Sequence, residues 1–162
     1  MELDLLSNSM IKRSTIALFI FLSAWNVSGQ NRTVRFEEIK ALQSVESKPI
    51  VVLIKTDWCK FCHAMQNTML KTPQVSQLLR NNFYTIFLNA EEKKSIFFAG
   101  REFNFRQGVN ELAQELATIN GRVSYPTLCI LNAQNEIIYQ YDGFLSAQAM
   151  EEVLTKIRKL EN

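Results

Sequence analysis

One short segment, IVVLIK at residues 50–55, constrains the fold more than any other part of the chain. It starts with five apolar residues in succession, four of them β-branched, which favours a β-strand. A strand without a polar face is buried on both sides, as in a sheet that helices cover on both faces. Apolar residues make up 47% of the chain, which is enough to fill such a core. We therefore expect this segment in the middle of a layered α/β structure.

Helix and strand patterns alternate along the rest of the chain. Apolar residues at three- and four-residue steps predict helices within 35–48, after Trp58, after Pro73, within 109–118 and after Ser146. Further strands are predicted within 83–90 and on both sides of a polar turn at 133–135. A helix between successive strands implies a parallel crossover, whereas a short turn implies an antiparallel pair. The predicted fold is a mixed central β-sheet flanked by helices.

Residues 91–108 do not continue this pattern. They begin with charged residues and then carry four phenylalanines, two of which lie between Gly100 and Gly108. We expect an insertion that forms a small hairpin or an irregular excursion. Its rings either pack a lid onto the core or form a surface for a partner, because exposed aromatic clusters are uncommon without one. The four residues are Phe97, Phe98, Phe103 and Phe105.

The N-terminus has the three-part layout of a secretory signal. Residues 10–29 start with two basic residues, continue with an apolar run at 16–25 and end in Val-Ser-Gly. The run is too short for a typical membrane-spanning helix. The acidic segment before Met10 does not fit a signal, so we expect translation to start at Met10 and residues 1–29 to be removed. The alternatives are an N-terminal core helix and an uncleaved anchor.

Charge and length limit the classes of function. The formal net charge is +2, and such an even balance does not indicate a nucleic-acid partner. At 162 residues the chain suits one domain, which we place at residues 30–162. Export would bring this domain into an oxidising compartment, and we expect that compartment to be the periplasm.

Two of the three cysteines, Cys59 and Cys62, are separated by only two residues. Such a pair can bind a metal, form a structural crosslink or act as a redox pair. Zinc needs about four ligands, and the single histidine, His63, and the remote Cys129 do not complete a set. A crosslink across so short a loop constrains almost nothing. We therefore predict a redox pair that needs no metal and no cofactor.

The predicted position of the pair favours thiol chemistry. Cys59 follows the end of the buried strand, and Cys62 falls in the first turn of the next helix. Free N–H groups at a helix start stabilise a thiolate, which is the form that attacks disulfides. We expect Cys59 to be the more exposed sulfur and the attacking one. Cys62 would then resolve the mixed disulfide.

Four neighbours of the pair each have two interpretations. Lys60 either favours the thiolate by its charge or is a solvated lysine at a loop tip. Trp58 either offers a flat apolar wall beside the sulfur or packs the loop. Asp57 either assists proton transfer or faces water. His63 is expected as a surface or capping residue rather than one with a chemical role.

The buried strand, the motif TDWCKFC at 56–62 and the segment SYPT at 124–127 together resemble the thioredoxin superfamily. The resemblance covers roughly residues 34–160. The chain is most similar to periplasmic thioredoxin-like proteins, a group that includes the C-terminal domain of the membrane thiol:disulfide interchange protein. It implies a thioredoxin fold in which Pro126 is cis and lies against the cysteines. It also implies that an extended substrate pairs with the backbone beside Tyr125, like an added strand.

The sequence departs from cytosolic thioredoxins at the site itself. Lys60 and Phe61 stand between the cysteines, where those proteins have Gly-Pro. Leu53 replaces their buried acidic residue and Phe87 replaces the lysine that faces it, so we do not expect their proton relay here. Cys129 is expected to be a small, buried apolar residue. The residues expected to support substrate binding are Trp58, Lys60, Phe61, Tyr125 and Pro126.

We expect an exported thiol–disulfide oxidoreductase that exchanges disulfides with protein substrates, as a reductase or interchange enzyme rather than an oxidase. Outside the cytosol such a reductase needs an electron donor, and the expected donor is a membrane-bound thiol:disulfide interchange protein. Two alternatives use the same groove. One is a non-enzymatic peptide-binding chaperone, and the other is a redox-sensing adaptor whose disulfide state alters the phenylalanine surface.

Overall fold

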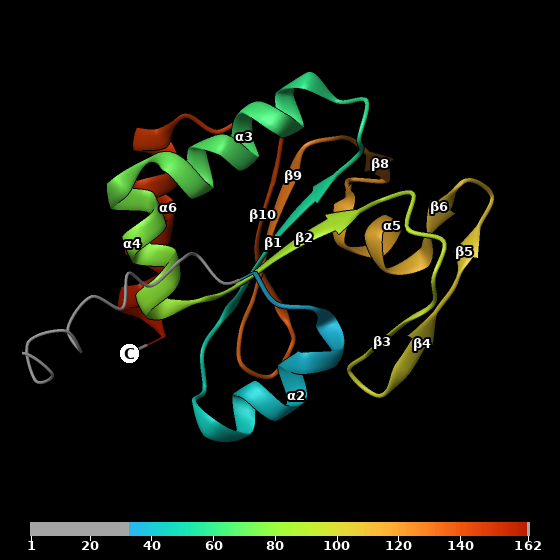
Figure 1. The fold of residues 1–162 in the computed structure, drawn as a ribbon, viewed down its shortest axis with the longest axis horizontal. Helices are drawn as coiled ribbons and strands as arrows, with labels where there is room; N and C mark the ends of the chain where they lie inside the picture. The colour runs from blue at the N-terminus through green and yellow to red at the C-terminus, as the bar shows by residue number, and fades with distance from the viewer. Residues whose placement is uncertain (1–32, 162) are drawn as a thin grey trace, which may run out of the picture. The chain divides into compact units, whose positions relative to one another are not determined.

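A computed structural model describes residues 33–161 of the chain (Figure 1). The expected signal peptide, residues 1–29, lies outside the described residues. Four strands form the central sheet in the order β10-β9-β1-β2. Their bounds are Ile50–Lys55 for β1, Tyr84–Asn89 for β2, Thr127–Leu131 for β9 and Ile137–Asp142 for β10. β1 and β2 are parallel, whereas β9 is antiparallel to β1 and β10, so the predicted mixed sheet is confirmed.

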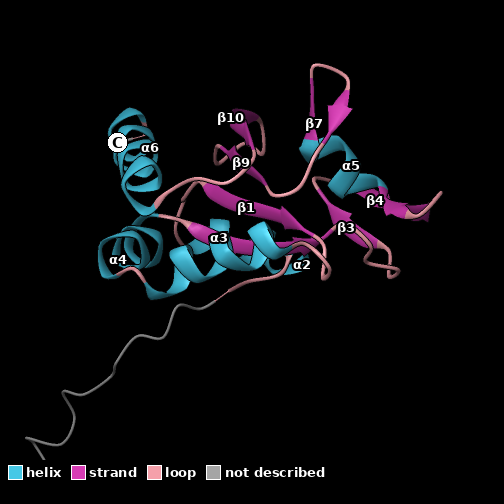
Figure 2. Ribbon diagram, turned by 90° about the horizontal axis from the view of Figure 1, so that it is seen from above, coloured by secondary structure: helices cyan, strands magenta, loops and turns pink. Residues whose placement is uncertain are grey.

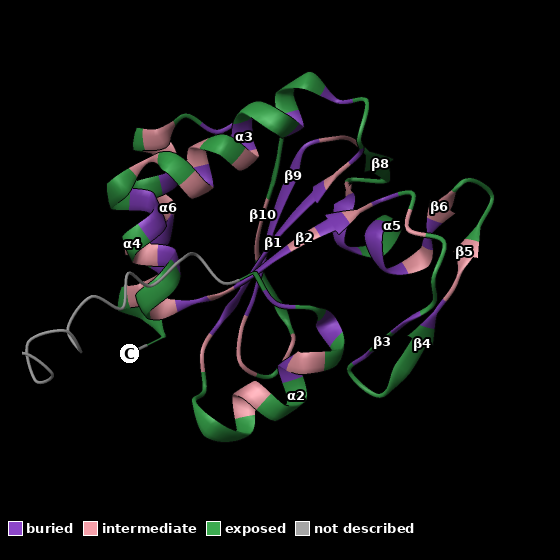
Figure 3. Ribbon diagram, in the orientation of Figure 1, coloured by how far each residue is buried: buried purple, intermediate pink, exposed green. Residues whose placement is uncertain are grey.

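Helices cover both faces of this sheet (Figures 1 and 2). Their bounds are Phe36–Val45 for α2, Lys60–Lys71 for α3, Pro73–Asn82 for α4, Glu111–Ala117 for α5 and Ala147–Leu160 for α6. The alternating side chains of β1 contact different layers. Val52 and Ile54 pack in a core with α2 and α5, whereas Val51 and Leu53 pack in a second core with α3, α4 and α6. Strand β1 is buried from its first residue through Ile54, as its composition predicts (Figure 3).

Local signals fix where most of the helices begin. Pro73 is the first residue of α4, a position where its missing N–H costs nothing. Ser146 caps α6, because its side chain accepts a hydrogen bond from the N–H of Ala149. The expected helical spacing starts at Val109, but α5 begins two residues later, at Glu111. Val109–Asn110 forms the short strand β6, and Asn110 then caps α5 by accepting from the N–H of Leu112.

The expected insertion contains two small hairpins. Strand β3 (Ile96–Phe98) pairs with β4 (Arg101–Phe103), and β5 (Phe105–Arg106) pairs with β6. The phenylalanines of the insertion differ in burial. Phe98 and Phe103 are buried, and the Phe98 ring meets that of Phe36 at 4.8 Å. Phe97 is 58% exposed, so these hairpins cover the core with only some of their rings.

One further hairpin was not predicted. Strands β7 (Thr118–Ile119) and β8 (Arg122–Val123) pair around Asn120 and Gly121. Both turn residues have positive φ, 52° and 75°, which suits an Asn-Gly turn. The Asn-Gly dipeptide is therefore the sequence signal that could have revealed this hairpin. Among residues 33–161, no helix combines the length and apolarity needed to cross a bilayer.

Candidate active site

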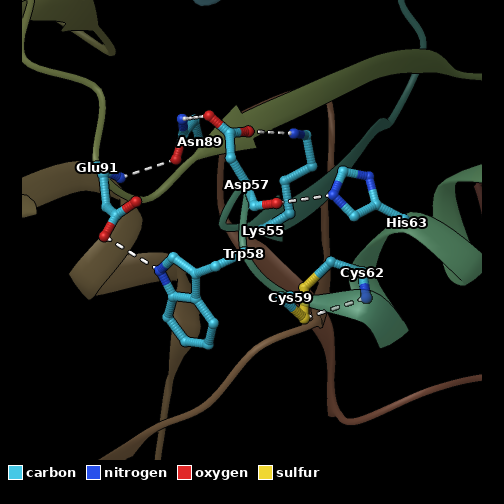
Figure 4. Close-up of polar contacts among 8 residues, drawn as sticks. All are labelled: Lys55, Asp57, Trp58, Cys59, Cys62, His63, Asn89 and Glu91. Atoms are coloured by element: carbon cyan, nitrogen blue, oxygen red, sulfur yellow. Dashed lines mark hydrogen bonds and ion pairs between the residues drawn. A yellow bond between two sulfur atoms is a disulfide. The ribbon is translucent and has the colours of Figure 1, made fainter.

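The two closely spaced cysteines form a disulfide at the start of α3 (Figure 4). Cys59 is the capping residue of this helix, and its Sγ accepts a hydrogen bond of 3.1 Å from the N–H of Cys62. The carbonyl oxygen of Cys59 also accepts from the N–H groups of Cys62 and His63. One sulfur thus lies where free N–H groups point outward and favour negative charge.

The two cysteines differ in burial, and Cys59 is the more exposed one, as expected. Cys59 is 7% exposed, whereas Cys62 is fully buried, so an attacking partner reaches Cys59 first. The residues next to the cysteines in the motif are exposed. Trp58 and Phe61 are each 69% exposed, and Lys60 between them in the motif is exposed as well. The motif therefore presents two apolar rings and one flexible positive charge to solvent.

Asp57 is held by neighbours rather than facing water alone (Figure 4). One carboxylate oxygen pairs with Lys55 Nζ at 3.1 Å, and the other accepts from Asn89 Nδ2 at 3.1 Å. Lys55 and Asn89 are direct partners in the β1–β2 register, so the ends of two parallel strands bring these groups together. His63, which is exposed, bonds the Asp57 carbonyl oxygen through Nε2 at 2.8 Å. The loop before Cys59 is thereby fixed on three sides.

Trp58 is held from a second loop. Its indole Nε1 donates a hydrogen bond to Glu91 Oε1 at 3.2 Å, and its ring meets Tyr125 edge-on with centroids 6.5 Å apart. Burial, and then the charge of Glu91, raise the pKa of Tyr125. The sequence interpretation missed Asn89 and Glu91. The sequence could have revealed them, because polar residues at the end of a strand parallel to β1 lie at the same sheet edge as the cysteines.

The segment around Pro126 reaches the same edge of the sheet. Ile54 pairs with Thr127, so the residues just before β9 lie level with the loop that leaves β1. The Tyr125–Pro126 peptide bond is cis. The carbonyl oxygen of Pro126 accepts from the N–H of Gly143 at 2.8 Å, which holds this segment to the end of β10. The sheet therefore brings Tyr125 and Pro126 to the edge where the cysteine motif begins.

The central strands near the site carry apolar residues on both faces. Leu53 is fully buried and pairs with Phe87 in the β1–β2 register, so two hydrocarbon side chains occupy these positions. Cys129 is fully buried in β9, and burial raises the pKa of its thiol to about 12. It remains a free thiol, as expected for a small core residue. Across residues 33–161, no group of three or more His, Cys, Asp and Glu side chains is arranged to bind a metal ion.

Comparison with known proteins identifies the family. The profile of the thioredoxin-like domain matches residues 36–158. The chain belongs to this family. This thioredoxin-like protein thus has the fold and the paired sulfurs of a thiol–disulfide oxidoreductase.

Solved structures share the fold at low sequence identity. A disulphide isomerase from Xylella fastidiosa Temecula1 is 17% identical with a TM-score of 0.54, and the match covers 83% of this chain and 98% of that one. The DsbH oxidoreductase is 15% identical with a TM-score of 0.54, covering 80% and 83%. Chloroplastic thioredoxin z is 15% identical with a TM-score of 0.51, covering 79% and 94%. A search of curated protein sequences gives no significant match.

Proposed function

We propose that the protein is an exported thiol–disulfide oxidoreductase that reduces or rearranges disulfides in protein substrates. The observation that carries the proposal is the Cys59–Cys62 disulfide at the start of α3, where Cys59 caps the helix and is the more exposed of the two cysteines, beside the exposed rings of Trp58 and Phe61 in the motif. The export step rests on the signal-like sequence at 10–29. The periplasm is the proposed setting, and the similar solved structures include two that are named as a disulphide isomerase and an oxidoreductase.

In the reductive direction the Cys59 thiolate attacks one sulfur of a substrate disulfide. The substrate S–S bond breaks, a mixed disulfide forms with Cys59, and the departing substrate thiolate takes up a proton. Cys62 then loses its proton and attacks Cys59 Sγ. The mixed disulfide breaks, the second substrate thiol is released, and the Cys59–Cys62 disulfide is formed. Two electrons have passed to the substrate, and a dithiol donor, proposed to be a membrane-bound interchange protein, restores the reduced pair.

The surroundings of Cys59 favour a polypeptide over a small disulfide. An extended substrate segment would pair with the backbone beside Tyr125 and Pro126, as in strand addition. Trp58 and Phe61 would contact its apolar side chains, because both rings are largely exposed next to a sulfur that is nearly buried. Lys60 would contribute a positive charge at the same rim.

The test measures reduction of a disulfide-bonded protein by a dithiol donor. The wild-type protein should accelerate this reaction, and Cys59→Ala should abolish the acceleration. Equal rates for the two proteins would show that the pair is not catalytic. Cys62→Ala should accumulate mixed disulfides with substrates, because the resolving thiol is missing. Suppressed aggregation of an unfolded protein by Cys59→Ala, together with no catalysis by the wild type, would instead support a peptide-binding chaperone.

A further inference from the structure

The indole of Trp58 is unusual for a side chain so exposed, because its orientation is fixed. The ring is 69% exposed, yet Nε1 donates to Glu91 Oε1 and the ring meets that of Tyr125 in an edge-to-face contact. Glu91 follows β2 and belongs to the start of the insertion, 33 residues away in sequence. Its own N–H donates to Asn89 Oδ1 at 3.0 Å (Figure 4). The residue beside Cys59 is thus oriented by a segment outside the cysteine motif.

Within the insertion, the buried residue Asn110 anchors the turn that carries Glu91, which is also bonded to β1 through the N–H of Ala90 and the carbonyl oxygen of Lys55. The backbone N–H of Asn110 donates to the carbonyl oxygen of Ala90 at 2.8 Å. Its side-chain Nδ2 donates to the carbonyl oxygens of Glu92 and Lys94 at 3.2 and 3.3 Å. Its Oδ1 accepts from the N–H of Leu112 at the start of α5. Asn110 is fully buried, so each of these bonds replaces a bond to water that the residue cannot make.

The two observations connect the insertion to the site. The hairpins begin after the Glu91 turn and end at Asn110, which returns to that turn and closes it. We propose that Glu91 is a positioning residue for Trp58, and that the insertion, through Asn110, holds Glu91 where it orients the indole beside Cys59. The inference rests on the proposed function, since the indole is taken to contact substrate. A preoriented ring loses less rotamer freedom when substrate binds, which favours binding.

The orientation of Trp58 can be measured directly. The chain has two tryptophans, Trp25 and Trp58, so the full chain with Trp25→Phe reports on Trp58 alone. In this background, Glu91→Ala should lower the fluorescence anisotropy of the indole and increase its quenching by acrylamide. Glu91→Gln keeps an acceptor oxygen and should restore the wild-type signal. Glu102→Ala removes an exposed carboxylate from β4 of the same insertion and serves as the matched control. Unchanged anisotropy in Glu91→Ala would overturn the proposal.

To test whether Asn110 anchors the turn, a variant must remove its bonds to the turn but keep its cap on α5. Asn110→Ser keeps an oxygen that can cap α5 but removes the two Nδ2 donors. It should lower the anisotropy of Trp58, as Glu91→Ala does, although the hydrogen bonds of Asn110 go to Ala90, Glu92, Lys94 and Leu112 and not to the ring. Because both changes act on one contact, the double variant should resemble Glu91→Ala alone rather than show the sum. Additive effects, or a folded Asn110→Ser protein with wild-type anisotropy, would contradict the anchor.

Kinetics give the second readout. Glu91→Ala should raise KM for a disulfide-bonded protein by about threefold to tenfold, the range of one hydrogen bond, with little change in kcat. Glu91→Gln should return KM to the wild-type range, which a general loss of folding would not do. A fall in kcat at unchanged KM would overturn the positioning role. Absence of catalysis by the wild type would refute the proposed function alone, because the fluorescence measurements would still decide whether Glu91 and Asn110 orient Trp58.

Discussion

The difference in stability between the oxidised and reduced protein is the most informative quantity to measure. The disulfide closes a loop with a sequence separation of 3, so the loop holds only four residues. Although the spacing of the cysteines predicts a crosslink almost without effect, the loss of chain entropy in the unfolded state still stabilises the oxidised protein by about 2 kcal/mol, less than the roughly 3–5 kcal/mol of loops of about 15–100 residues. This corresponds to a rise of roughly 5–10 °C in the thermal midpoint. It would also make the folded pair about 40 mV more reducing than the same pair in an unfolded chain.

The opposing contribution comes from the Cys59 thiolate. In the reduced protein, the N–H of Cys62 that lies 3.1 Å from Cys59 Sγ would donate a charge-assisted hydrogen bond. Such a bond contributes about 1.5–3 kcal/mol, but only once the sulfur is ionised. The oxidised protein should therefore exceed the reduced one by at most about 2 kcal/mol in unfolding free energy, and any shortfall from that value measures the contribution of this bond.

Urea unfolding with and without a thiol reductant measures this difference. The control is the Cys59→Ser, Cys62→Ser double variant, whose stability should not depend on the reductant. An oxidised protein that exceeds the reduced one by much more than about 2 kcal/mol would refute the reasoning. A reduced form that is clearly the more stable one would favour an oxidase over the proposed reductase.

Three further predictions test the core and the rim. In the reduced native protein at pH 8, Cys59 should react quickly with Ellman's reagent and Cys62 should then displace the bound thionitrobenzoate, so that two equivalents are released. Because burial raises the pKa of Cys129 to about 12, its thiol should react only on unfolding, and three equivalents released quickly would contradict this. Leu53→Ala leaves a cavity under the site and should lower the free energy of unfolding in urea by about 2–5 kcal/mol. A loss below about 1 kcal/mol would show instead that neighbouring side chains move in and fill the cavity. Phe61→Ala removes a largely exposed ring, so the free energy of unfolding in urea should stay within about 0.5 kcal/mol of wild type while KM for a protein disulfide rises. An unchanged KM would exclude substrate contact.

The central sheet was predictable because its signals are local. An unbroken apolar segment specified β1, and the polar turn between β9 and β10 specified an antiparallel pair. The start of α5 was placed too early, because the helical spacing of Val109 and Leu112 outweighed the capping preference of Asn110. The two-residue strands were missed for a related reason. Pairs that short have no periodicity of their own, and only the Asn-Gly turn indicated one of them.

The sequence by itself determined the parts of the site that are continuous in the chain. Two cysteines at the start of a helix, after a buried strand, are enough to predict which sulfur is more exposed and what it can attack. Only the tertiary structure decided what orients them. Asp57 meets Asn89 and Trp58 meets Glu91 across separations of 32 and 33 residues, because the parallel register of β1 and β2 brings the ends of the two strands together. Periodicity and spacing describe one segment at a time, whereas such contacts depend on which strands pair and on where the insertion is anchored.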